Sequence, residues 1–535
     1  MWVNAFLALS MIRGGRISRS CVALFGSALL LLACSDPSPV VSDYPPADLG
    51  EFLTDVRDEW ILSEAEAIKW HEVKDEKGPA FTGNPSWHQF VAYVEEKLGE
   101  YGVVDIQRNQ WSFRRWHSSE WPDRSNWSLV ADGEELEVAN YGANSGSTGP
   151  DGVTGELVYY DKTNPPDDIA GKIVVFSTVV DQALVNRFSN SDFEYRSGFE
   201  SFPEYGHPIP DDLTDFQSSG IFLQLMQIPA FIDIATQGGA VGVLFVLDAG
   251  RDLMAGIYTF PVPRIYAAPS LYLDRTAGKK VIEAAKASAH ATLRLEATTT
   301  ESTAYQLIGY LPGSKYNTPD DEQVRLITHT DGPSISQDNG ALGILGVIKY
   351  MSQIPQAERP RTLMVFLDCR HFMPGAEQAF AEQDWFVRNP DADDPIVAVI
   401  GMEHLGQIEF VEDGDTLVES GRVYPSQIWT TNNSKMVELA AKAVEDNNLP
   451  SAYVRNVARP GVHGGNQGRW FGMAKFAPAT GVPAFAIMGF MGAYWATSSD
   501  IERFDARLFR RQVATFVQLT GELMTADLRE VSTVR

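Results

Sequence analysis

Histidine and carboxylate side chains gather in the last part of the chain, where they follow apolar stretches. His329, His371 and His404 each come within a few residues of such a stretch. The acidic residues close to them are Asp331, Asp338, Asp368 and Glu403. Imidazole and carboxylate groups are the donors that suit zinc. Taken singly, each histidine is compatible with an ordinary surface or core position, but the set together favours a metal site.

The elements that must position these side chains predict an α/β domain. Apolar segments typical of strands alternate with segments typical of amphipathic helices, and such alternation indicates a largely parallel sheet. The predicted strands are residues 324–328, 362–367, 396–400 and 482–488, and the predicted helices are residues 341–351 and 504–524. In an open sheet of this kind, ligand sites form outside the carboxyl ends of the strands. The three histidines are therefore expected to meet at one edge of the sheet.

The chain ahead of this segment has further regular elements. Residues 85–101 predict an amphipathic helix, because apolar side chains recur there at helical spacing. Short buried strands are expected at 171–176 and 242–246. Residues 183–225 are rich in aromatic and polar side chains and are long for a loop. This stretch is either a lid or binding surface, or a surface excursion that packs on its own domain.

A His-Thr-Asp motif at 329–331 is followed by an Asp-Asn-Gly motif at 338–340, which opens an apolar helix. The two resemble the His-x-Asp and Asp-Asn motifs of the di-zinc aminopeptidases, a family that includes secreted bacterial aminopeptidases, glutamate carboxypeptidase and carboxypeptidase Q. Residues 136–299 are similar to the β-rich protease-associated domain that many members carry as an insert. The resemblance implies a zinc-exopeptidase-like α/β fold, with a mixed, largely parallel sheet flanked by helices, built from residues 47–135 plus 300–527.

The resemblance also implies roles for single residues. His329 would bind the first zinc ion, Asp331 would orient that histidine, and Asp338 would bridge two zinc ions. Glu403 stands where the family has an aspartate ligand to the first zinc. The candidate metal ligands are therefore His329, Asp338, His371, Glu403 and His404.

The second half of the metal site departs from the family pattern. Arg370 and His371 stand where the family has a Glu-Glu pair, whose first member is the general base and whose second member binds zinc. Histidine can bind zinc, whereas arginine stays protonated and cannot accept a proton. Trp495 stands at the position of the last histidine ligand. The sequence therefore predicts at most one tightly bound zinc ion, with Glu377 or Glu403 as the substitute base.

Two functions are compatible with these motifs. The first is a zinc-dependent exopeptidase, an aminopeptidase or a carboxypeptidase, in which His463 or Glu377 is available as a replacement ligand. The second is a catalytically inactive relative that binds peptides, in which Arg370 holds a substrate carboxylate through a bidentate contact. A further alternative for Arg370 is an ion pair with a nearby carboxylate such as Asp368 or Glu377. A purely structural protein would leave the histidine set without a purpose, and the first half of the site favours the enzyme.

The first 34 residues predict a signal peptide. A segment with three arginines, residues 13–19, precedes an apolar run at 21–33 that is too short for a comfortable membrane span. The run ends in Leu-Leu-Ala-Cys, which resembles a bacterial lipobox with Cys34 as the lipidated residue. Residues 35–46 are rich in Ser, Pro and Asp and indicate a flexible tether. We expect an exported protein held by lipid in the bacterial cell envelope; the alternative is an ordinary secretory signal with a chance cysteine.

The charge of the chain limits its partners. It has 70 acidic residues against 43 lysine and arginine residues, which gives a formal net charge of −27. Such a chain repels phosphate backbones and anionic membrane surfaces. Nucleic acid is therefore not expected as a partner, a peptide substrate is, and membrane contact is expected through the lipid anchor alone.

Overall fold

The computed structural model describes residues 49–119, 123–178, 194–197, 219–255, 265–373, 395–457, 472–477, 482–489 and 501–532. These residues all belong to one unit, Asp48–Arg535. The predicted signal peptide, the tether and Cys34 lie outside the described residues, as does most of the stretch at 183–225. Among the helices described, none is long and apolar enough to cross a membrane.

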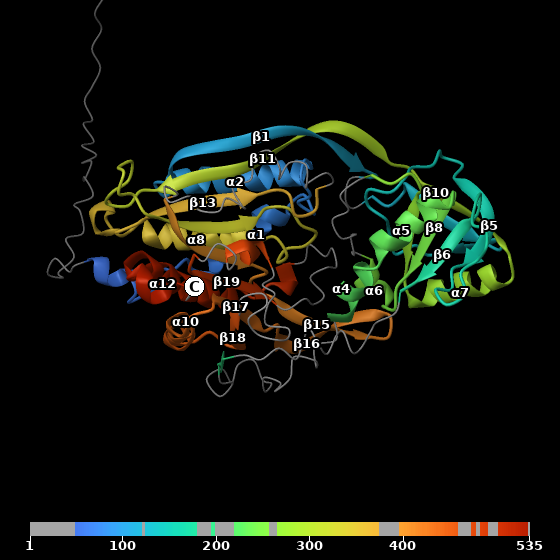
Figure 1. Cartoon of the computed structure of the whole chain (residues 1–535). Helices are drawn as coiled ribbons and strands as arrows, with labels where there is room; N and C mark the ends of the chain where they lie inside the picture. The colour runs from blue at the N-terminus through green and yellow to red at the C-terminus, as the bar shows by residue number, and fades with distance from the viewer. Residues whose placement is uncertain are drawn as a thin grey trace, which may run out of the picture. The chain divides into compact units, whose positions relative to one another are not determined.

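A nine-stranded mixed sheet carries the predicted histidines (Figure 1). Its strands, in spatial order, are β1 (Val104–His117), β11 (Thr298–Leu311), β13 (Thr362–Asp368), β12 (Gln323–His329), β14 (Ile396–Glu403), β19 (Ala484–Gly489), β17 (Ser426–Thr431), β18 (Ala452–Val457) and β7 (Tyr195–Arg196). The four central strands, β13, β12, β14 and β19, run parallel and are the four that the sequence predicted. Each is short and almost wholly buried, as strands covered on both faces are. The predicted fold class, α/β with a mixed sheet flanked by helices, is confirmed.

Helices share a core with one face of this sheet. They are α1 (Glu64–Asp75), α2 (Pro85–Glu100), α8 (Gly340–Met351), α10 (Ser434–Asp446), α12 (Ala506–Thr525) and the short α13 (Leu528–Val531). Apolar spacing predicted α2, α8 and α12. In α8, Lys349 alone is not buried. A Cβ atom on Gly340 would overlap the carbonyl oxygen of Met402, so glycine lets the start of α8 lie against the end of β14.

The helix α1 was not predicted by apolar periodicity. A capping box starts it: Ser63 Oγ accepts a hydrogen bond from the N–H of Glu66 at 3.2 Å, and Glu66 Oε2 accepts one from the N–H of Ser63 at 3.0 Å. Its buried face carries Ala67, Trp70, His71 and Lys74. Because two of these four side chains are polar, the helix shows no apolar repeat. It packs against α2 and α12 and so places a histidine and a lysine inside the protein.

Residues 127–295 contribute a second, eight-stranded sheet. Its strands, in spatial order, are β3 (Glu134–Leu136), β2 (Trp127–Ala131), β10 (His290–Leu295), β5 (Val153–Tyr159), β6 (Ile173–Ser177), β8 (Gly242–Val246), β9 (Ser270–Leu273) and β4 (Asn140–Tyr141). The helices of this region are α4 (Ser219–Leu225), α5 (Ile228–Gln237), α6 (Arg251–Met254) and α7 (Arg275–Lys286). Alternate residues of β6 and β8 enter two separate apolar cores. The sheet lies where an inserted domain was predicted, although β2 begins before the predicted boundary at 136.

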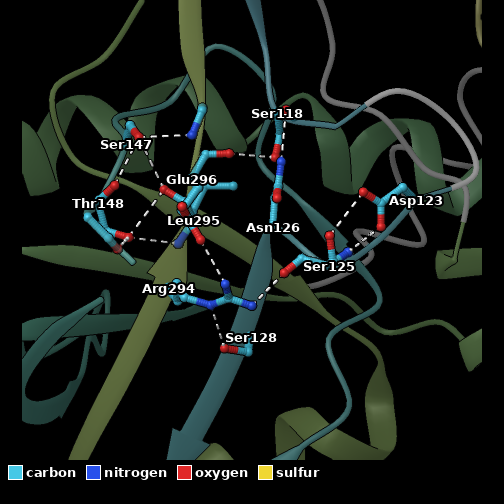
Figure 2. A network of polar contacts seen from close by, with 12 residues as sticks. Ser118, Asp123, Ser125, Asn126, Ser128, Ser147, Thr148, Arg294, Leu295 and Glu296 are labelled. Carbon is cyan, nitrogen blue, oxygen red and sulfur yellow. Dashed lines mark hydrogen bonds and ion pairs between the residues drawn. The ribbon is translucent and has the colours of Figure 1, made fainter. Parts of the chain in front are cut away.

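Two long strands, β1 and β11, pair antiparallel and connect the two sheets. A polar network fastens the point where they join the second sheet (Figure 2). Arg294 donates hydrogen bonds to Glu296 Oε1 at 2.7 Å and to Ser128 Oγ at 3.3 Å. Asn126 Nδ2 donates to the carbonyl oxygen of Ser118 at 3.0 Å, and Ser118 Oγ donates to the carbonyl oxygen of Glu296 at 2.8 Å. The bond from Ser118 holds the end of β1 against the link between β10 and β11.

A separate two-stranded ribbon, β15 (Ile408–Asp413) and β16 (Thr416–Val423), follows β14. The N–H of Gly250 donates a hydrogen bond to Glu412 Oε1, and the N–H of Asp252 donates one to the carbonyl oxygen of Asp415 at 3.0 Å. The ribbon was not predicted, because its half-exposed strands carry little apolar pattern.

Candidate metal site

Three parallel strand ends form one side of the site. His329 ends β12, Asp368 ends β13 and Glu403 ends β14, and His329 lies opposite Asp368 in the register of the sheet. Because the carboxyl ends of parallel strands meet at one edge, residues that are far apart in sequence come together there.

Within the described part of the chain, one group of side chains has the geometry to hold a metal ion: His329, Glu403 and His404. Their ligand atoms all lie within 4.8 Å of one another, and all three side chains are buried. His404 directly follows Glu403, and in a regular strand the two side chains would point to opposite faces. The backbone of His404 is left-handed, with a φ of 57°, which takes it out of that alternation and allows its ring to lie with Glu403.

The orientation of His329 leaves a lone pair facing a carboxylate. Its Nδ1 lies 2.8 Å from the carbonyl oxygen of Asp331, so we assign the proton to Nδ1 and the lone pair to Nε2. Nε2 lies 3.6 Å from Glu403 Oε2 and has no hydrogen bond to any described residue. Two electron-pair donors thus face each other in a buried site, an arrangement that a metal ion satisfies. Two imidazoles and one carboxylate are also a ligand set of catalytic zinc sites.

Burial keeps both imidazoles of this group neutral. It lowers the pKa of His329 to about 4 and the pKa of His404 to about 3. Neutral imidazole is the form that binds a metal. Burial also raises the pKa of Glu403 to about 7, although the N–H of Met473 donates a hydrogen bond to this carboxylate. A divalent cation favours the ionised carboxylate, so metal binding below about pH 7 would release a proton from Glu403.

Asp331 holds the neighbouring loop through its carboxylate. The carboxylate accepts hydrogen bonds from the N–H of His371 at 3.1 Å and from the N–H of Phe372 at 2.7 Å, and it lies 3.9 Å from His329 Nδ1. The sequence predicted that Asp331 orients His329. The main-chain carbonyl group of Asp331 does this, and its carboxylate does not. The ring of His371 lies beside that of His329, with centroids 4.3 Å apart, but its nitrogens are not among the grouped ligand atoms.

Asp338 has a partner that the sequence did not reveal. Lys74 of α1 lies against it, with 2.6 Å between Nζ and Oδ1, and at most 2% of either side chain is exposed. The ammonium group lies against Oδ1 of Asp338 and would repel a divalent cation there, so a second metal ion bridged by Asp338 does not fit. Of the five candidate ligands, the structure groups His329, Glu403 and His404, and Asp338 is not among the grouped ligand atoms.

Asn339 ties the start of α8 to the segment after β14. Its Nδ2 donates a hydrogen bond to the carbonyl oxygen of Leu405 at 2.8 Å, and its Oδ1 accepts one from the N–H of Leu405 at 2.9 Å. The same Nδ2 lies 3.0 Å from Nε2 of His71 in α1. These bonds hold Asp338, the neighbour of Asn339, close to the segment that carries His404.

Arg370 is buried against Asp368. Its Nε lies 2.9 Å and 3.0 Å from the two carboxylate oxygens, and its Nη2 lies 2.6 Å from Oδ2. Gln306 Nε2 also donates to this carboxylate at 2.9 Å. Of the roles considered for Arg370, the structure bears out the ion pair with Asp368. Nε and Nη2, which form one edge of the guanidinium, already meet Asp368, and the bidentate contact to a substrate carboxylate stays a prediction.

Three residues of the predicted site lie outside the described residues: Glu377, His463 and Trp495. Glu377 as a substitute base and His463 as a replacement ligand therefore stay predictions. Sequence reasoning missed Lys74 and α1, the helix that carries it. The one signal that could have found the helix is the Ser-x-x-Glu capping motif at 63–66.

No family model matches the chain, and no curated protein matches it. A peptidase M28 precursor from Shewanella amazonensis SB2B has a similar structure, with a TM-score of 0.58 and 14% sequence identity, covering 89% of this chain and 95% of that chain. The zinc aminopeptidase BSAP from Bacillus subtilis gives 0.54 at 12% identity, covering 88% and 98%. An aminopeptidase from Aneurinibacillus sp. strain AM-1 gives 0.52 at 12% identity, covering 89% and 96%. Similarity at this level of identity concerns the fold: over most of its length, the chain has the fold of zinc aminopeptidases.

Proposed function

We propose that the protein is a one-zinc exopeptidase of the bacterial cell envelope, which hydrolyses peptides that have a free terminus. One observation carries this proposal. Two neutral imidazoles and one carboxylate, from His329, His404 and Glu403, present buried ligand atoms within 4.8 Å of one another. Zinc held there by three protein ligands would keep a position for water or a substrate carbonyl.

The residues around the group have supporting roles in this proposal. Zinc, when bound, supplies a Lewis acid that polarises a peptide carbonyl and acidifies a water molecule. Asp331 fixes the tautomer of His329 through its carbonyl oxygen, so that the lone pair of Nε2 faces the metal position. The N–H of Met473 donates to Glu403 and holds the carboxylate in place.

Among the described residues of the site, each carboxylate already has another role, so none is left as general base. This favours a second candidate function. Of the four acidic residues close to the histidines, three are engaged: Asp331 by main-chain amides, Asp338 by Lys74 and Asp368 by Arg370. Glu403 belongs to the metal group itself. Without a base, catalysis loses typically ~10²–10⁴ in rate. The second candidate is therefore a catalytically inactive relative that binds zinc and peptides.

Two further parts of the proposal concern the rest of the chain. We propose that residues 136–299 are a protease-associated domain, which is supported by a separate sheet with its own two cores. We also propose that Cys34 carries lipid, which is supported by the Leu-Leu-Ala-Cys sequence that ends the apolar leader.

A peptidase screen tests the proposal. The purified chain is assayed on peptides with free and with blocked termini, before and after removal of metal by a chelator. We expect cleavage from a free terminus that disappears with the chelator and with His329→Ala, but persists in His290→Ala, which changes an exposed histidine of β10. Zinc and peptide binding without any cleavage would establish the second candidate, and a chain that binds no zinc would contradict both.

A further inference from the structure

The geometry points to Lys74 as a built-in cation, which takes the place of a second metal ion beside Asp338. The inference rests on the proposed metal site, because it states how the other half of that site is completed. A metal ion at His329, Glu403 and His404 would then be accompanied by a fixed ammonium group rather than by a second metal ion.

Two oxygen atoms hold the ammonium group, which also lies 5.5 Å from the centroid of the Phe90 ring. Lys74 Nζ lies 2.6 Å from Asp338 Oδ1 and donates a hydrogen bond to the carbonyl oxygen of Ser334 at 2.9 Å. Both charged side chains are buried. Carboxylate and carbonyl oxygens are also the ligands that hard divalent cations use in proteins. With the lysine side chain removed, these two oxygen atoms would be available to a metal ion.

Neighbouring contacts set the position of Lys74. His71 and Lys74 are three residues apart on α1 and so lie on the same face of the helix. His71 contacts Asn339, and Lys74 contacts Asp338. Two neighbours on one face of α1 therefore contact two consecutive residues just before α8. The ring of His71 also stacks on Phe504, with centroids 3.7 Å apart. The packing of α1 thus fixes the position from which the Lys74 side chain reaches Asp338.

The ammonium group of Lys74 and a second metal ion exclude each other, because both are positively charged. An ammonium group and a divalent ion on the same carboxylate would repel, and in a buried site the repulsion is poorly screened. Lys74 is therefore a positioning residue: it holds Asp338 in place and excludes a second metal ion.

Counting metal ions tests the inference. The full chain is equilibrated with excess Zn²⁺ or Mn²⁺, freed of unbound metal, and analysed by elemental mass spectrometry. We expect Lys74→Ala to hold one more metal ion per chain than the wild type. Lys349→Ala is the matched control, because Lys349 forms an ion pair with Glu66 at 2.5 Å in a partly exposed position. Its metal content should equal that of the wild type.

The outcomes separate this inference from the proposed function. A wild type with no metal and a Lys74→Ala variant with one would overturn the proposed function and support the inference. Equal metal content in the wild type and in folded Lys74→Ala, or two metal ions in the wild type, would overturn the inference. If Lys74→Ala does not fold without metal, it is refolded with Mn²⁺ or Zn²⁺ beside Lys74→Gln/Asp338→Asn, in which both charges are absent. Rescue by metal in the single variant alone supports the inference, and failure of rescue overturns it.

Discussion

Replacement of Arg370 by leucine tests whether this residue is a structural partner or a residue that recognises substrate. The change removes three side-chain contacts of 2.6–3.0 Å from the Asp368 carboxylate, which has no exposed surface. The carboxylate keeps the N–H of residue 370 at 3.0 Å and Gln306 at 2.9 Å. Breaking one side of a buried ion pair costs about 3–5 kcal/mol, and because these two hydrogen bonds remain we expect about 3 kcal/mol.

The assay is urea unfolding followed by tryptophan fluorescence, together with peptide binding. The double variant Arg370→Leu/Asp368→Asn should recover most of the lost stability, because no charge is then left uncompensated in the interior. Arg108→Leu is the control: its ion pair with Glu95 is partly exposed, and such pairs contribute about 0–1 kcal/mol. An Arg370→Leu variant as stable as the wild type that fails to bind peptides with a free carboxylate would refute the structural reading of this residue.

Three further predictions follow from the site and the leader. Zinc affinity should fall about tenfold per pH unit below pH 7, because a proton competes with zinc for Glu403, whose pKa burial raises to about 7. The two imidazoles do not add to this fall, since they are neutral down to about pH 4. Equal zinc affinity at pH 6 and pH 8 in a competition titration would contradict this. Gly340→Ala should lower the free energy of unfolding by about 1–3 kcal/mol through overlap with the carbonyl group of Met402, whereas Gly99→Ala in α2, whose Cβ would lie 4.0 Å from Ile106, should not destabilise the protein. Cys34→Ser should release the protein from membranes, and a variant that still fractionates with membranes in high salt would disprove the lipid anchor.

The central strands and the edge that carries the site could be predicted from the sequence. Runs such as 324–328 and 362–367 are mostly apolar because their strands are buried on both faces, and a parallel arrangement places their carboxyl ends together. This reasoning located His329 and Glu403 without any knowledge of their distances.

The local geometry of the site could not be predicted in the same way. His404 was a candidate ligand because it follows a predicted strand, but strand alternation would place it on the face opposite to Glu403, and its left-handed backbone conformation changes that. Lys74 belongs to a helix whose buried face is half polar, so no apolar pattern marked it, and its contact with Asp338 joins two distant parts of the chain. The sequence showed that Arg370 replaces an acidic residue of the family, but not which of the available carboxylates it meets.

Metal content tests the central claim most directly. The full chain is loaded with Zn²⁺, freed of unbound metal and analysed for zinc per chain, alongside His329→Ala, His404→Ala and the exposed-residue control His290→Ala. The account predicts one zinc ion in the wild type and in His290→Ala, and its loss in both variants of the metal group. A wild type without zinc, or zinc that persists undiminished in His329→Ala, would contradict it.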